Sequence, residues 1–179
     1  MSVEEAVQKA AEIARVHNPA GLVPFPFQET ANSIDELSLF YLDNMPDEVS
    51  GAIFFRDGEF SVAINKNKPV VRQNFTVAHE FGHYFLHRQW LVDNAETVLV
   101  DFSNLDSEGM LLNSDTAPTD EENMNKEREA NHFAAELLMP EDKLRQFWEL
   151  TTDVQKCAEA FQVSVVAMAI RLEKMGLVA

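Results

Sequence analysis

The chain has 179 residues and a formal net charge of −16 at pH 7. Its content of 46% hydrophobic and 25% charged residues is that of an ordinary globular protein, and its length predicts one domain with at most a small appendage. The negative charge argues against a protein that binds nucleic acid through its phosphates, and no apolar run is long enough to span a membrane. One cysteine, Cys157, excludes an internal disulfide and predicts a protein of the reducing cytoplasm.

The first fifty residues are predicted to form a helix and an extended segment that leads into the core. Ser2 and Glu5 form a capping box, which opens a helix that runs to His17. Residues 18–21 end this helix. The stretch 22–27 is interrupted by two prolines, which predicts an extended tether.

The next segment has the pattern of a small β-sheet. Three stretches alternate or are rich in aromatic and β-branched residues, and we expect them to be strands: 37–42, 51–56 and 59–65. Asp57-Gly58 is a strong hairpin signal between the last two. We therefore predict an α+β fold in which an antiparallel sheet of about three strands packs on helices. Residues 97–100 are a candidate for a further short strand.

A helix predicted over residues 76–87 contains the pattern His-Glu-x-x-His. His79 and His83 lie one turn apart on the same helix face, a spacing at which two imidazoles can hold one zinc ion. Glu80 lies beside them, where it can reach a water in an open metal position. The alternative is a core helix with two partly exposed histidines, but it would leave Glu80 as an unpaired carboxylate in apolar surroundings, which is costly.

Three other residues of this region also carry expectations. Gly82 inside a helix costs about 1 kcal/mol relative to alanine, so it predicts the close approach of another backbone. Arg72 is expected either to meet an acidic partner or substrate, or to stay solvated. His87 is expected to cap the helix end or form a nearby hydrogen bond, and not to bind the metal.

A catalytic zinc site needs a third protein ligand and one open position. Residues 127–140 are the other stretch suited to supply that ligand. They are predicted to form a helix that ends at Pro140. Glu129, His132 and Glu136 share one face of this helix and are all geometrically possible ligands. The spacing alone does not choose among them.

Two blocks of sequence together resemble the ImmA/IrrE family of zinc metallopeptidases, and they stand in the order typical of that family. The blocks are residues 72–87, RQNFTVAHEFGHYFLH, and residues 127–140, EREANHFAAELLMP. The resemblance extends over roughly residues 50–179. The first fifty residues match no family pattern.

This resemblance implies a function and a set of site residues. It implies Zn²⁺ as the cofactor, with His79, His83 and Glu129 as metal ligands and Glu80 as the general base. It favours Glu129 because this residue directly precedes Ala-Asn in the motif. It also implies an intracellular protease that cleaves a regulatory protein such as a helix-turn-helix transcriptional repressor. The alternative is a metal-binding regulatory or interaction module, related to toxin–antitoxin pairs or phage, without robust peptidase activity.

The remaining sequence is acidic and then helical. Residues 89–125 contain no lysine or arginine, and we expect a solvated loop in preference to an acidic rim that selects basic substrates. Thr119 and Glu122 form a second capping box, which is expected to open the helix that carries Glu129.

Residues 151–179 have the pattern of a helix-turn-helix-like pair, and Ser164 is expected to cap its second helix. That helix has only Arg171 and Lys174 as basic residues, so we predict a packing or partner-docking role and no direct contact with nucleic acid. The predicted division of the chain is an N-terminal helix and extended segment (1–50), a metallopeptidase core (51–150) and a C-terminal helical pair (151–179).

Overall fold

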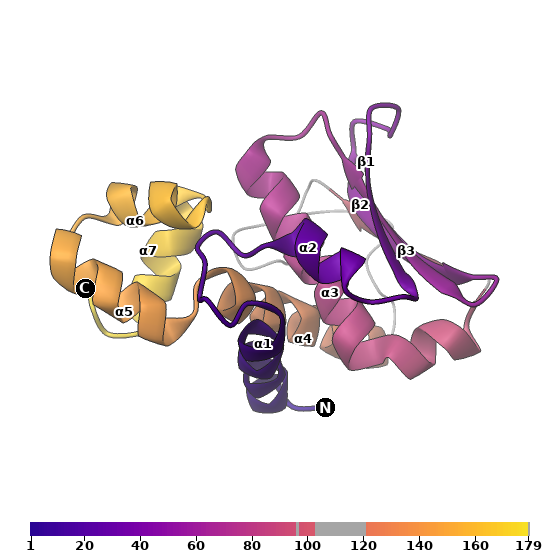
Figure 1. The fold of residues 1–179 in the computed structure, drawn as a ribbon, viewed down its shortest axis with the longest axis horizontal. Coiled ribbons are helices and arrows are strands. Elements are labelled where there is room, and N and C mark those ends of the chain that lie inside the picture. Colours follow the sequence, from indigo (N-terminus) through magenta and orange to yellow (C-terminus); the bar gives the residue numbers. More distant parts are fainter. Residues whose placement is uncertain (96, 103–120, 179) are drawn as a thin grey trace.

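The computed structural model describes residues 1–95, 97–102 and 121–178. Within these ranges the chain forms a mixed sheet and seven helices, in the arrangement that Figure 1 shows. The elements in chain order are α1 (Val3–His17), α2 (Phe27–Asn32), β1 (Leu37–Leu42), β2 (Val49–Arg56), β3 (Glu59–Asn65), α3 (Val70–Asp93), β4 (Val98–Phe102), α4 (Glu121–Leu138), α5 (Glu141–Thr151), α6 (Val154–Phe161) and α7 (Val165–Lys174).

The described sheet has four strands in the order β1-β3-β2-β4. The hairpin of β2 and β3 is confirmed, with Ile53 opposite Val62, and the candidate short strand forms as β4, antiparallel to β2. The expectation of about three antiparallel strands is wrong in both number and direction, because β1 pairs in parallel with β3, with Leu39 opposite Val62. The side chains of Phe60, Val62 and Ile64 in β3 are fully buried. A strand of this kind belongs inside a sheet, and β1 supplies its second neighbour.

Helix α3 is the element between the sheet and the remaining helices. It contacts β2 and β3 on one side and α4 on the other, and α1 packs against both α3 and α4. Figure 1 shows α5, α6 and α7 gathered at the end of the molecule away from the sheet. None of the helices in the described part of the chain is long and apolar enough to cross a membrane.

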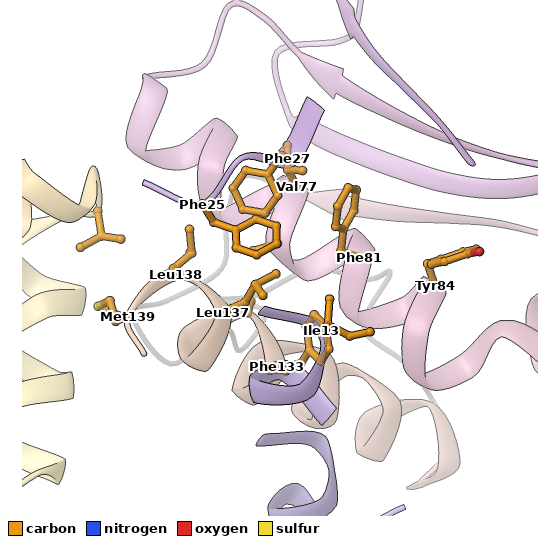
Figure 2. Packing of buried hydrophobic residues seen from close by; sticks show 14 of the residues in the cluster. Ile13, Phe25, Phe27, Val77, Phe81, Tyr84, Phe133, Leu137, Leu138 and Met139 are labelled. Carbon is orange, nitrogen blue, oxygen red and sulfur yellow. The ribbon is translucent and has the colours of Figure 1, made fainter. Parts of the chain in front are cut away.

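The part of the hydrophobic core nearest the site lies between α3, α4, α1 and the segment that leads into α2. Phe27 meets Phe81 of α3 edge to face, with ring centroids 5.5 Å apart, and Phe133 and Leu137 close the core from α4 (Figure 2). Fully burying an aromatic or aliphatic side chain of this size contributes about 1.5–3 kcal/mol. The core therefore fixes the separation of α3 and α4.

The expected close approach at Gly82 is confirmed. A Cβ placed on Gly82 would lie 2.9 Å from the Cα and 3.1 Å from the carbonyl oxygen of Ala130 in α4. Any side chain at this position would overlap the backbone of the neighbouring helix. Gly82 thus allows α3 and α4 to cross in contact, next to the two predicted metal ligands.

Helix α7 docks onto the core through one of its two basic residues. Ser164 caps α7 as expected, because its Oγ accepts a hydrogen bond from the Ala167 amide. Arg171 of α7 pairs with the carboxylate of Glu136 in α4, and its Nε donates to the Met139 carbonyl at 3.2 Å. Arg171 therefore has a partner within the chain, in line with the packing role expected for this helix.

Two expectations from the sequence lie outside the described residues. The capping box of Thr119 and Glu122 depends on residue 119, although α4 itself is present from Glu121. Residues 103–120 of the acidic segment also lie outside them, whereas its described residues belong largely to α3, β4 and α4, so the expectation of a loop is wrong for that part. The division of the chain at residues 50 and 150 stays a prediction.

Candidate metal centre

Helix α3 brings His79 and His83 together at the crossing with α4. Both side chains are buried, and their Nε2 atoms lie 3.0 Å apart. The i, i+4 spacing puts them on the same helix face, as the sequence predicts. Two imidazole nitrogens that converge at this distance, inside a protein, have the arrangement of ligands around a shared cation.

A carboxylate of α4 completes the cluster, and it belongs to Glu127. Its Oε2 lies 3.2 Å from Nε2 of His79, and its Oε1 lies 3.4 Å from Nε2 of His83. One ligand atom from each of the three residues lies within 4.8 Å of the others. A tetrahedral zinc ion with bonds of about 2.0–2.1 Å holds its ligand atoms about 3.3 Å apart, so these three residues fit zinc and leave a fourth position open.

Glu129, which the sequence motif implied as the third ligand, is not brought to the two histidines in this structure. Its Oε2 lies 2.9 Å from Nε2 of His87, and its Oε1 lies 3.4 Å from the amino group of Met1. The reason is the rotation of α4 about its axis: two residues along a helix turn a side chain by about 200°, so Glu127 and Glu129 cannot both face the same site. Among the described residues, His132 and Glu136 also lie outside the metal-binding group.

A signal for Glu127 was present in the sequence. Gly82 marks the place where α3 is crossed, and small residues on the neighbouring helix mark the face that crosses it. Ala130 is that small residue, and Glu127 lies three positions before it, one turn away on the same face. Asn131, four residues after Glu127, faces the same way, because its Oδ1 lies 2.9 Å from Nδ1 of His79.

The charges at the cluster shift the pKa values of its members in opposite directions. Burial lowers the pKa of His79, but the hydrogen bond to Glu127 and the nearby carboxylates of Glu80 and Asp101 outweigh burial and raise it to about 9. For His83 burial dominates and lowers the pKa. Burial opposes ionisation of Glu127, yet the two histidines hold its pKa well below the usual range. The site therefore favours a cation next to an ionised Glu127.

Glu80 is the buried acid beside these ligands. Its Oε2 is the one carboxylate oxygen among the described, buried side chains that has no hydrogen-bond partner. Burial raises its pKa well above the usual value, and repulsion by Asp101 and Glu127 adds to the effect. A carboxylate in this environment can take up a proton readily, as a general base must.

A second polar cluster fixes β4 to the start of α3. Arg72 donates to both carboxylate oxygens of Asp101, at 2.7 and 3.0 Å, and Thr76 donates to the same carboxylate at 2.8 Å. Asp101 is thus an acidic partner of Arg72, which is one of the alternatives that the sequence left open. No role for Thr76 or Asp101 at the site was expected from the sequence. Together they hold strand β4 one helical turn before His79.

The helix with His-Glu-x-x-His and the carboxylate of the crossing helix define a candidate metal centre of the zinc-peptidase type. The chain belongs to the peptidase family described as the IrrE N-terminal-like domain, whose family model matches residues 38–173. This confirms the family resemblance found in the sequence, but the match begins at residue 38, within the first fifty residues, for which no resemblance was expected. The comparison with curated proteins gave no match.

Among solved structures, a transcriptional regulator from Mycobacterium tuberculosis is similar, with a TM-score of 0.60 and 16% sequence identity. The alignment covers 93% of this chain and 46% of the regulator, so this chain spans less than half of that protein's length. At this identity the likeness concerns the fold.

Proposed function

We propose that the protein is a zinc-dependent metalloendopeptidase in which His79, His83 and Glu127 hold the metal and Glu80 is the general base. The observation that carries the proposal is the convergence of three ligand atoms within 4.8 Å beside a buried carboxylate oxygen that has no partner. A site that only stored or displayed a metal would not need that carboxylate. Peptide hydrolysis does need it, because a proton must leave the attacking water.

In this proposal, different residues bind the metal and transfer the proton during peptide hydrolysis. Bound zinc would supply a Lewis acid that polarises the peptide carbonyl and increases the acidity of water. Glu80 Oε2 accepts the proton from the attacking water and later returns it to the leaving amine. Its buried position keeps bulk water away from this carboxylate, so its proton affinity stays high.

The proposed substrate is a cytoplasmic regulatory protein, such as a helix-turn-helix repressor. Family membership supports a protein substrate, and the net charge of −16 favours a basic partner protein over nucleic acid. Strand β4 is an edge strand of the described sheet and is fixed to α3 through Asp101. An extended peptide that paired with such an edge would be presented in a regular conformation.

The test compares metal content and peptide hydrolysis in four proteins: wild type, His79→Ala, Glu80→Gln and the control His132→Ala. His132 is a histidine of α4 outside the cluster, so its variant reports unspecific effects of losing an imidazole. We expect about one zinc per chain in wild type, Glu80→Gln and His132→Ala, and none in His79→Ala. Only wild type and His132→Ala should cleave a repressor substrate.

Two results would contradict the proposed peptidase function. A wild type that binds no zinc under zinc-replete conditions would remove the basis of the proposal. A wild type that binds zinc, but whose effect on a partner is the same in Glu80→Gln, would favour the metal-binding interaction module.

A further inference from the structure

A line of buried polar contacts continues beyond the proposed metal ligands, away from Glu127. Nδ1 of His83 lies 3.2 Å from Nδ1 of His87, and Nε2 of His87 lies 2.9 Å from Oε2 of Glu129. His87 is 8% exposed and Glu129 is 4% exposed, so water does not replace these contacts. The line joins two helices, because His83 and His87 belong to α3 and Glu129 to α4.

The proton positions along this line follow from the chemistry of imidazole. Nε2 of His83 faces His79 and Glu127, and a metal ligand must present a lone pair there. A neutral imidazole with a lone pair on Nε2 carries its proton on Nδ1. Nδ1 of His83 is therefore the donor, and Nδ1 of His87 must accept.

The same reasoning then fixes the second contact. A neutral His87 that accepts at Nδ1 carries its proton on Nε2, and this N–H points to the carboxylate of Glu129. All four atoms in the line are satisfied by this single arrangement of neutral rings. The opposite arrangement would place a proton on Nε2 of His83, where it would block metal binding.

We propose that His87 and Glu129 are positioning residues, which hold His83 in its metal-binding tautomer and ring orientation and make its Nε2 more basic. The inference rests on the metal site of the proposed function. It gives Glu129 a role behind the metal ligand, in place of the ligand role that the sequence motif implied. Partners of this kind, which accept the second N–H of a ligating histidine, orient the ring and tune the metal.

The two ligating histidines are thus held differently. Nδ1 of His79 meets the neutral amide oxygen of Asn131, whereas Nδ1 of His83 meets a histidine that is itself backed by a carboxylate. Since a carboxylate at the end of the line polarises both N–H bonds, His83 should be the stronger donor to the metal.

The first test measures zinc affinity of the purified full chain by competition with a chelator, in wild type and four variants. His87→Phe keeps a ring but removes both nitrogens, whereas His87→Gln can still accept from His83 and donate to Glu129. Glu129→Gln removes the charge. Phe161→Leu is a matched control, because Phe161 is equally buried but belongs to α6, which carries no member of the described metal-binding group.

We expect His87→Phe to weaken zinc binding by about 10- to 100-fold, the usual loss for an outer partner of a ligating histidine. Glu129→Gln should also weaken it, and His87→Gln should recover most of the affinity. Phe161→Leu should lower the melting temperature of the metal-free protein and leave zinc affinity unchanged. A purely structural role for His87 would instead make His87→Phe behave like Phe161→Leu.

The second test determines which ring nitrogen of each histidine carries the proton, by ¹⁵N–¹H correlation spectra of zinc-loaded wild type. It does not depend on the folding of any variant. We expect a proton on Nδ1 of His83 and on Nε2 of His87. A proton on Nδ1 of His87, or wild-type zinc affinity in His87→Phe, would overturn the inference while the proposed metal site stands. A wild type that binds no zinc would overturn both.

Discussion

Replacing Gly82 with alanine tests whether the contact between α3 and α4 sets the metal site. The added Cβ would lie 2.9 Å from the Cα, 3.1 Å from the carbonyl oxygen and 3.2 Å from the Cβ of Ala130. Ordinary contact begins at 3.4 Å, so the helices must separate by about 0.5 Å at this point. The two nearest atoms are backbone, and no change of rotamer can relieve the overlap.

Two opposing effects set the size of the change. Alanine gains about 1 kcal/mol over glycine in a helix interior. Overpacking of a well-packed contact costs about 1–3 kcal/mol. We therefore expect Gly82→Ala to lower the free energy of unfolding of the metal-free protein by about 1 kcal/mol, which moves the urea midpoint down by about 0.5 M for a slope of about 2 kcal/mol per M.

Zinc affinity should fall as well, because Glu127 lies one turn from Ala130 on α4, whereas His79 and His83 lie on α3. Ligand distances in a metal site tolerate about 0.2 Å, less than the expected separation of the helices. The control Gly82→Ala/Ala130→Gly removes only the 3.2 Å contact and should rescue little. If the Gly82→Ala protein is more stable by about 1 kcal/mol and its zinc affinity is unchanged, this reasoning is refuted. The substitution would then act through helix propensity alone, with no steric overlap.

Two further predictions concern charges. In the metal-free protein His79 has a pKa raised from 6.5 to about 9, so its protonated form stabilises the fold below pH 6.5, and this contribution is lost as the pH rises through 9. Melting temperatures measured against pH should fall across this window in wild type and change less in Glu127→Gln. Arg171→Met should destabilise the protein by about 2–3 kcal/mol, because it leaves the buried carboxylate of Glu136 unpaired. In urea unfolding, the double variant Arg171→Met/Glu136→Met should be more stable than Arg171→Met alone; equal stability would contradict the pairing.

Local features of the fold followed from local sequence. The hairpin at Asp57-Gly58 formed because a two-residue turn of this type selects its own strand pairing. The cap at Ser164 and the end of α4 before Pro140 follow from backbone hydrogen bonding within a few residues. The parallel pairing of β1 with β3 had no such local signal, because the turn between β1 and β2 does not determine which strand lies between them.

The convergence of His79 and His83 was predictable from the sequence, because residues four apart on a helix share a face. The approach of another backbone at Gly82 was predictable too, because glycine in a helix is otherwise unfavourable. The placement of Glu127 beside the histidines, with Glu129 turned to His87, was not predictable from the motif and is seen only in the folded chain. That choice depends on the rotation of α4 about its own axis, which is set by core packing over the whole length of the helix and not by the motif that contains both carboxylates.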